Sequence, residues 1–292
     1  MIKEVKTAVF PVGGFGTRFL PATKAVPKEL LPIVDKPLIQ YAFEEATNAG
    51  IENFIFITAR NKEAIANHFD HAYELQEALK TKGKLQILEE TEEWLPEPGN
   101  IAFIRQQEPA GLGHSILCAK NFLKDSPFVV ILPDEIFKPD GKPFLKEMID
   151  IYNEKGGNII GVSDVPESKI SRYGIVDPES DDGKIIKVKG MVEKPEPKDA
   201  PSNTSIAGPY ILQYEVFDYL ENGTRAKDNE IQLTDALNTM QKDVPTHGVR
   251  FFGRRFDCGS RHGYIDANIA FALDREDMKE NVLDVLRHYD SK

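Results

Sequence analysis

The first long apolar run of the chain, Thr7–Val12, ends at a pair of glycines, Gly13 and Gly14. A run without polar–apolar alternation is typical of a strand that is buried on both faces of a sheet. Three more elements alternate after it: a helix at Leu38–Ala46, a strand at Asn53–Thr58 and a helix at Lys62–Phe69. Strands and helices that alternate in this way predict an α/β fold, with a mixed, mostly parallel sheet flanked by helices.

Segments further along the chain predict more strands of the sheet and then a change to short strands separated by turns. We expect strands at Ile101–Arg105, Phe128–Leu132 and Ile159–Val165, with a surface excursion at Glu89–Gly99 and a helix at Phe144–Asn153. Short strands separated by turn residues then predict a smaller, partly antiparallel lobe beside a cleft: Ile175–Asp177, Ile185–Glu193 and Ser205–Leu212. The last expected elements are a helix at Leu233–Met240, a strand at Phe251–Phe256 and a helix from Tyr264 to the C-terminus.

Length, charge and cysteine content restrict the class of protein. A chain of 292 residues is long enough to bury a substantial core. Its formal net charge of −11 argues against a nucleic-acid partner, which needs a basic surface. We expect no membrane partner, because no apolar run approaches about 20 residues and the N-terminus has no signal-peptide pattern. Two cysteines, Cys118 and Cys258, make no disulfide framework, so we expect reduced thiols in a cytoplasmic protein.

The segment around the first glycines is a local cationic region in this acidic chain. Between Val5 and Lys28 it contains no acidic residue, and its cations are Lys6, Arg18, Lys24 and Lys28 itself. Glycines let backbone N–H groups approach a phosphate closely, and turned N–H groups form an anion-binding nest. The combination predicts a polyphosphate site.

This loop matches neither of two common nucleotide-binding loops. Gly14-Phe-Gly16 lacks the third glycine of the dinucleotide fingerprint, and no Gly-Lys-Ser/Thr sequence marks a Walker loop. The alternative interpretation is a tight strand-to-helix turn with solvated cations nearby. The spacing of Arg18 and Lys28 favours the phosphate site.

Two carboxylates follow predicted strands. Asp134 comes directly after the run Phe128–Leu132, and Asp257 ends the predicted strand Phe251–Phe256. In α/β sheets, ligands bind beyond the carboxyl ends of the strands, and Mg²⁺ prefers one or two carboxylates together with phosphate oxygens. Asp134 is therefore a candidate Mg²⁺ ligand, and Asp257 is a possible second one. The alternative for Asp134 is a residue that caps the following turn.

Two further patterns are candidate contacts for a nucleotide sugar. Glu193-Lys194 ends a strand with a carboxylate that can accept hydrogen bonds from sugar hydroxyls and an ammonium that can bind phosphate. An exposed edge-strand ion pair is the alternative. After Gln106, the segment Gly111–His114 opens a helical stretch and can present backbone groups to a base edge, although a plain loop–helix junction fits equally well.

Taken in order, these segments closely resemble the bacterial UTP–glucose-1-phosphate uridylyltransferases of the nucleotidyltransferase superfamily. The similar segments span nearly the whole chain: Gly13–Lys24, Pro27–Pro32, Asp35–Tyr41, Gly111–His114, Ile131–Asp134, Tyr173–Gly174, Glu193–Pro195, Ala200–Asn203, Glu230–Ala236 and Asp257–Gly259. Related thymidylyltransferases share the spacing between Arg18 and Lys28 but usually carry glutamine after that lysine. Here that residue is Glu29, which favours the uridylyl branch.

The resemblance implies a Rossmann-like fold in a single domain, 1–292. It implies a nucleotide-binding core at 1–165, a sugar-phosphate lobe with returning strands at 166–260, and C-terminal helices at 261–292. The residues implied to hold uridine are Gly13, Gly14, Glu29, Gln106 and Gly111. Those implied to face the sugar phosphate are Gly174, Glu193, Lys194 and Gly208. The implied catalytic cations are Arg18, Lys28 and Lys194, and the implied Mg²⁺ ligands are Asp134 and Asp257.

The implied reaction is Mg²⁺-dependent, in-line transfer of UMP from UTP to glucose 1-phosphate, which gives UDP-glucose and pyrophosphate. The attacking phosphate is already anionic because the second pKa of a phosphate monoester is about 6. Two other functions stay open: a related nucleotidylyltransferase that uses dTTP or another hexose 1-phosphate such as galactose 1-phosphate, and a catalytically silent UDP-sugar sensor. The resemblance also implies a homodimer or homotetramer. The segment Glu276–Tyr289 is a candidate contact, and an ordinary packing helix is the alternative.

Overall fold

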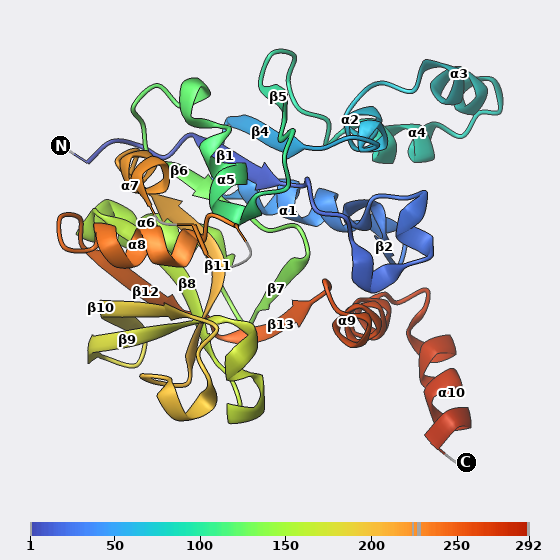
Figure 1. Ribbon diagram of the computed structural model, residues 1–292. Helices are drawn as coiled ribbons and strands as arrows, with labels where there is room; N and C mark the ends of the chain where they lie inside the picture. Colours follow the sequence, from blue (N-terminus) through green and yellow to red (C-terminus); the bar gives the residue numbers. More distant parts are fainter. Residues whose placement is uncertain (1, 224, 227–228, 291–292) are drawn as a thin grey trace.

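A mixed sheet forms the centre of the structure, a computed structural model that describes residues 2–223, 225–226 and 229–290. Within these residues the strand order is β5-β4-β1-β6-β11-β8-β12-β10-β9 (Figure 1). The bounds of these strands are, in the same order, Ile101–Arg105, Asn53–Thr58, Thr7–Pro11, Phe128–Val130, Thr204–Leu212, Asn158–Asp164, Thr246–Arg250, Ile185–Glu193 and Gly174–Asp181. Strands β10 and β11 run opposite to the others, so the predicted mixed α/β sheet is confirmed.

The half of the sheet formed by β5, β4, β1 and β6 is parallel. Val9 in β1 is aligned with Ile55 on one side and with Val130 on the other. Because successive side chains point to opposite faces, Val9 packs into one core and Phe10 into the other. The carboxyl ends of these parallel strands meet at one edge, where the loops that follow β1, β5 and β6 emerge side by side.

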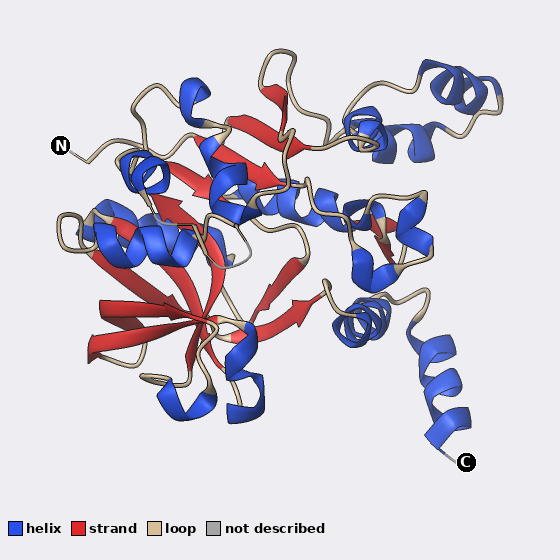
Figure 2. Ribbon diagram, in the orientation of Figure 1, coloured by secondary structure: helices blue, strands red, loops and turns tan. Residues whose placement is uncertain are grey.

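Helices cover both faces of the sheet (Figure 2). One core is closed by α5 (Gly111–Leu117), α7 (Val216–Asn222) and α8 (Leu233–Met240). The core on the other face is closed by α1 (Leu38–Asn48), α2 (Glu63–His68) and α6 (Phe144–Lys155). The short 3₁₀ helices are η1 (Thr17–Phe19), η2 (Ala22–Lys24), η3 (Lys28–Leu30), η4 (Lys120–Phe122), η5 (Glu167–Arg172) and η6 (Pro197–Asp199).

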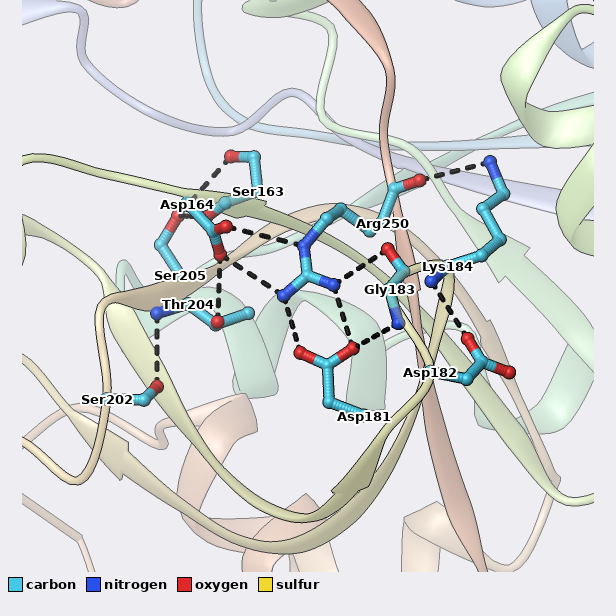
Figure 3. A network of polar contacts seen from close by, with 10 residues as sticks. All are labelled: Ser163, Asp164, Asp181, Asp182, Gly183, Lys184, Ser202, Thr204, Ser205 and Arg250. Carbon is cyan, nitrogen blue, oxygen red and sulfur yellow. Dashed lines mark hydrogen bonds and ion pairs between the residues drawn. The ribbon is translucent and has the colours of Figure 1, made fainter.

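The other half of the sheet curls into a partly closed barrel. Strand β11 pairs with β8 and also with β9, where Ser205 is aligned with Ile175. Arg250 at the end of β12 ties this barrel together: it donates to both carboxylate oxygens of Asp181 and forms an ion pair with Asp164 (Figure 3). Hydrogen bonding from Arg250 lowers the pKa of Asp181 to about 2. Three strands are therefore cross-linked at one point.

Two short ribbons lie outside the main sheet. Strands β7 (Glu135–Pro139) and β13 (Gly253–Asp257) pair antiparallel, and so do β2 (Pro32–Ile33) and β3 (Lys36–Pro37). Together with α9 (Arg261–Asp274) they enclose a third, smaller core. The β7–β13 ribbon carries the residues that follow Asp134 and those that precede Cys258.

The predicted strand Phe251–Phe256 is wrong in its bounds. The structure has β12 before it, at Thr246–Arg250, and β13 at Gly253–Asp257. The break falls at Phe251 and Phe252, just before Gly253, whose φ of +131° few other residues adopt; a Cβ on Gly253 would lie 2.4 Å from the carbonyl oxygen of Lys138. Sequence periodicity does not reveal that β12 and β13 join different sheets.

Two other expectations need correction. The expected helix from Tyr264 to the C-terminus is two helices, α9 and α10 (Lys279–Asp290), and residues 291–292 lie outside the described residues. The expected excursion Glu89–Gly99 begins inside α4 (Leu85–Glu92), which follows α3 (Tyr73–Thr81). Trp94 is half-buried and packs edge-on against Phe43, while most of the segment is exposed, so its surface location is confirmed and only its helical beginning was not expected. Among the described residues, no helix combines the length and apolarity that a membrane crossing requires.

Candidate active site

The glycine loop after β1 lies against the end of β5. Val12 continues the ladder by donating its N–H to Ile57 O at 2.9 Å. A Cβ added to Gly13 would lie only 2.9 Å from Oε1 of Gln106, so a larger residue would displace that amide from its present position. Gly16 has a φ of +64°, and its carbonyl accepts from the Thr23 hydroxyl at 2.7 Å. The structure thus brings together two of the residues predicted to hold a nucleotide, Gly13 and Gln106.

Lys28 lies beside this loop and pairs with Asp134. Its Nζ donates to Asp134 Oδ2 at 2.6 Å, and both side chains are about one-quarter exposed. Burial alone raises the pKa of Asp134, but the Lys28 ammonium outweighs burial and the net pKa lies below its ordinary value. Burial opposes the charged form of Lys28, yet the neighbouring carboxylates raise its pKa overall. Both groups are therefore charged at neutral pH.

Asp134 and Asp257 converge on the backbone of Gly259. A Cβ added there would lie 2.8 Å from Asp134 Oδ2 and 3.1 Å from Asp257 Oδ1. The backbone holds the two aspartates close, because Cys258 donates its N–H to Asp134 O at 2.7 Å. Arg18 reaches the same place from η1, where its Nη1 donates to Gly259 O at 3.4 Å. Two carboxylates and two cations are thus gathered within a single small region.

This region fits a magnesium ion on its donor chemistry. The described residues hold no cluster of three or more His, Cys, Asp and Glu side chains with the arrangement of a metal site. Mg²⁺ does not need one, because it commonly takes one or two protein carboxylates and completes its shell with phosphate oxygens and water. The missing side chain of Gly259 leaves the space into which both carboxylate oxygens point.

Glu29, next to Lys28, is almost fully buried. Lys62 donates to its Oε2 at 2.6 Å, and the exposed fractions of the Lys62 and Glu29 side chains are 8% and 1%. Its Oε1 has no hydrogen-bond partner within the described residues. Burial raises the pKa of Glu29, and the Lys62 ammonium opposes that rise.

Gly111 lies close to Gln106 but in a crowded place. Gln106 donates from its amide to Gly111 O at 3.2 Å and contacts His114 Nδ1 at 3.0 Å. Gly111 has a φ of +91°, and a Cβ there would lie 2.8 Å from the Cβ of Glu230. The loop that opens α5 is therefore fixed against the segment that precedes α8.

On the barrel side, Glu193 and Lys194 end β10. The Thr234 hydroxyl donates to Glu193 Oε2 at 2.7 Å, while Lys194 Nζ lies 3.0 Å from Glu193 Oε1. Lys194 has a φ of +44°, a conformation uncommon for residues other than glycine and often found at functional sites. Its N–H donates to Tyr173 O at 3.1 Å, and a Cβ on Gly174 would lie 3.2 Å from Glu193 Oε2.

A cavity of about 180 Å³ adjoins these residues. Gly174 and Glu193 line it, as do Glu135 and Arg255, which come from the same ribbon as the two aspartates. Gly208 does not line it: this residue is buried in a bulge of β11, and its neighbour Ala207 lines the cavity instead. The cavity therefore lies beside Glu193 and reaches Glu135, the residue that follows Asp134.

Three contributors to the site were not predicted from the sequence. Lys62 and Thr234 hold Glu29 and Glu193 in place; Lys62 lies outside the similar segments, and Thr234 lies in the segment Glu230–Ala236 but was given no role there. Gly259 stands two residues after Asp257, and its role follows only from the folded backbone. Contacts of this kind join elements that are far apart in sequence, so spacing alone does not reveal them.

The fold and the charges at this sheet edge define an enzyme that transfers a nucleotidyl group. A family model described as nucleotidyl transferase matches residues 7–272, and the chain belongs to this family. Among its relatives is the UTP–glucose-1-phosphate uridylyltransferase of Staphylococcus haemolyticus, which is 46% identical over 286 residues, 98% of this chain and 99% of that protein. The resemblance inferred from the sequence is thereby confirmed.

Solved structures give the same result. The UTP-bound UGPase from Acinetobacter baumannii is 39% identical, with a TM-score of 0.89 over 97% of this chain and 98% of that one. A UDP-glucose pyrophosphorylase complexed with UDP-glucose is 40% identical, with a TM-score of 0.82 over 93% of this chain and 100% of that one. The similarity therefore covers the nucleotide half and the barrel half alike.

Proposed function

We propose that this chain is a UTP–glucose-1-phosphate uridylyltransferase, which converts UTP and glucose 1-phosphate into UDP-glucose and pyrophosphate. Full-length similarity to enzymes with that name supports the activity. The observation that carries the proposal within this chain is the convergence of Asp134 and Asp257 on Gly259, with Lys28 and Arg18 beside them.

The reaction is an in-line displacement at the α-phosphorus of UTP. A phosphate oxygen of glucose 1-phosphate forms the new P–O bond, and the bond to the β-phosphate bridging oxygen breaks, so that pyrophosphate leaves with its electron pair. No general base is required, because the nucleophile is already ionised at neutral pH. The obstacle is repulsion between two polyanions. Arg18 and Lys28 hold the triphosphate, and Lys194 holds the incoming phosphate.

The nucleotide half of the site is the glycine loop and its neighbours, within a Rossmann-like core at 1–165. Gly13 and Gly14 offer backbone N–H groups to the nucleotide, and Gln106 lies directly beside Gly13. Glu29 presents an oxygen that has no partner within the described residues. With Gly111, these residues hold the uridine part of UTP.

The sugar-phosphate half lies on the barrel side, within 166–260, and the C-terminal helices follow at 261–292. Glu193, held by Thr234, accepts hydrogen bonds from sugar hydroxyls, and Lys194 binds the phosphate. Gly174 leaves room beside Glu193. Gly208 contributes through the shape of β11, since it is buried. A cavity of about 180 Å³ provides the space for the sugar ring.

Asp134 and Asp257 are the residues that would hold Mg²⁺. Their two carboxylate oxygens point into the space left by Gly259, and the pKa of Asp134 lies below its ordinary value, so this carboxylate is ionised at neutral pH. When bound, the ion supplies positive charge that stabilises the triphosphate and the departing pyrophosphate. Lys28 then exchanges its carboxylate partner for a phosphate oxygen.

The experiment that tests the proposed function is a substrate panel read by pyrophosphate release. UTP and dTTP are each combined with glucose 1-phosphate and galactose 1-phosphate, with and without Mg²⁺. The proposal expects turnover to be highest with UTP and glucose 1-phosphate and to depend on Mg²⁺. Preference for dTTP or for galactose 1-phosphate would assign a sister activity. Binding of UDP-glucose without turnover on any pair would make the chain a UDP-sugar sensor.

We also propose that the chain forms a homodimer or homotetramer and acts in the cytoplasm. Within the described residues α10 has no buried residue, and it exposes Val285, Leu286 and Tyr289. An amphipathic helix of this kind gains stability by packing against a second copy. Both cysteines are free thiols, which suits a reducing compartment. Light scattering of the purified chain measures the assembly state, and a monomer would contradict the first proposal.

A further inference from the structure

A buried ion pair lies directly beside the two aspartates. Arg255 in β13 precedes Asp257 by two residues, and Glu135 in β7 follows Asp134. Arg255 donates from Nε to Glu135 Oε2 at 2.8 Å and from Nη2 to Glu135 Oε1 at 3.0 Å. The exposed fractions of the two side chains are 12% and 13%. This bidentate pair therefore spans the ribbon whose strands lead to both carboxylates.

The register of the ribbon makes the pair a geometric constraint on those carboxylates. Glu135 is aligned with Asp257 across the two strands, and the ladder continues through the hydrogen bond from Cys258 N to Asp134 O. A slip of β13 along β7 would move Asp257 away from Asp134. It would also break the bidentate contact, whose planar fork accepts only one arrangement.

The third side of the Arg255 guanidinium faces the barrel. Its Nη1 donates to Ser163 Oγ at 3.1 Å, and its carbon lies 4.9 Å from the centre of the Tyr173 ring. The Tyr173 carbonyl accepts from the N–H of Lys194. Arg255 is therefore linked to the proposed metal ligand Asp134 through its neighbour Glu135, and to Lys194 through Tyr173.

Stability alone is a poor explanation for this arrangement. A buried ion pair commonly contributes no more to stability than well-packed apolar residues of similar size, whereas its bidentate geometry fixes one register. The pair also lines the cavity of about 180 Å³ beside Glu193. Arg255 and Glu135 therefore adjoin the barrel side of the site as well as the ribbon that leads to the two aspartates.

We propose that Arg255 is a positioning residue for uridylyl transfer. Through Glu135 it sets the separation of Asp134 and Asp257, and through Tyr173 it holds the segment that carries Lys194 in register with them. This inference rests on the proposed function for the identity of the two half-sites. Its tests therefore include metal binding, which is measured without turnover.

Arg255→Lys is the main variant, because it keeps the positive charge and loses the bidentate fork. Arg254→Lys is the matched control, because Arg254 lies next to it on the same strand but is half-exposed and pairs with Asp266. Binding of Mn²⁺ in the presence of UTP alone is followed by electron paramagnetic resonance. Thermal unfolding of each variant is recorded beside it.

For Arg255→Lys we expect Mn²⁺ affinity to fall by about 10-fold and kcat to fall by about 10- to 100-fold, the range typical of residues that orient metal ligands. The KM for UTP should stay within about twofold, because the glycine loop is untouched. Arg254→Lys should bind Mn²⁺ and turn over like the wild type. Unchanged Mn²⁺ affinity and kcat in Arg255→Lys would overturn the proposal, and so would losses fully explained by a smaller folded fraction.

A second variant separates the effect of Arg255 through Glu135 from its effect through Tyr173, and it remains informative if Arg255→Lys folds poorly. Tyr173→Leu removes the ring under the guanidinium but leaves the Glu135 contact. We expect its Mn²⁺ affinity to match that of the wild type while kcat and the affinity for glucose 1-phosphate fall. If Tyr173→Leu loses as much Mn²⁺ affinity as Arg255→Lys, the two contacts of Arg255 do not act separately, which would contradict the proposal. If the wild type binds Mn²⁺ yet releases no pyrophosphate, the proposed function fails while the metal-positioning arm is still tested.

Discussion

The ammonium group of Lys28 lies 2.6 Å from the carboxylate of Asp134. Lys28 is proposed to hold the triphosphate and Asp134 to hold Mg²⁺. In the chain without ligands, the ammonium group of Lys28 and the carboxylate of Asp134 are instead paired with each other. This pairing compensates both charges. In the proposed function, binding of substrate and metal would exchange these ionic partners for a phosphate oxygen and Mg²⁺.

Lys28→Met tests this exchange. Without Lys28, the partly buried Asp134 carboxylate loses its ion-pair partner and keeps the weaker attraction of Arg18, and we expect a loss of about 1–3 kcal/mol of stability in the absence of metal. Mg²⁺ should recover part of that loss, so the increase in Tm on adding Mg²⁺ should be larger than in the wild type. Turnover should fall about 100-fold or more, because the variant lacks a cation that binds the triphosphate. An equal Mg²⁺-induced increase in both proteins would contradict the exchange.

Gly259→Ala tests the space between the aspartates. The added methyl group would lie 2.8 Å from Asp134 Oδ2, and the backbone of Gly259 is not in the left-handed region, so the clash is the main effect. We expect a higher Mg²⁺ concentration for half-maximal activity and a fall in kcat of about 10-fold or more. Gly141→Ala is the control, since a Cβ there has no neighbour within 4 Å. Identical Mg²⁺ titrations for the two variants would refute the assignment.

Gly13→Ala tests the contact between the glycine loop and Gln106. A methyl group at this position would lie 2.9 Å from Gln106 Oε1 and must displace that amide. We expect KM for UTP to rise about 10-fold. In a double-mutant cycle with Gln106→Ala, the second substitution should add little, because neighbouring residues couple by about 0.5–3 kcal/mol. Fully additive effects on KM would show that the two residues act separately.

Stability should depend on pH through a residue outside the site. Burial raises the pKa of Glu45 in α1 from 4.5 to about 7, although the Leu145 N–H donates to its carboxylate. The folded state thus holds this proton more tightly than the unfolded state, so stability falls as pH rises from about 4.5 to about 7 and is level above that. Glu45→Gln should remove this loss and be more stable by about 1–3 kcal/mol at pH 8. Urea unfolding at pH 4.5 and 8 measures it. Equal stabilities of the two proteins at pH 8 would contradict the buried assignment.

Much of the nucleotide half followed from the sequence. The run Thr7–Val12 and the alternation after it predicted β1, α1 and β4 nearly to the residue. Local patterns succeed here because each parallel strand is buried on both faces and each helix has one apolar stripe. Asp134 was expected directly after a strand ending at Leu132, whereas β6 ends at Val130 and Asp134 lies in the turn that joins β6 to β7.

The sequence was less informative about the second half of the site. The backbone turn at Gly253, just after the break between β12 and β13, packs against the carbonyl of Lys138, which lies more than a hundred residues earlier in the chain. The supports of the predicted residues, such as Lys62 under Glu29 and Thr234 beside Glu193, depend on tertiary contacts. The likeness to known enzymes indicated Gly208 as a sugar contact, and this role stays a prediction; the structure buries Gly208 in β11, and its neighbour Ala207 lines the cavity. Patterns report which residues follow a strand, and packing decides which of them reach a ligand.

The most direct measurement is a crystal structure of the chain with UDP-glucose and Mg²⁺. The account predicts the uridine over Gly13 and Gly14, the metal between Asp134 and Asp257, and the glucose against Glu193. Density for the nucleotide away from the glycine loop would contradict the central claim, as would a metal held by other carboxylates.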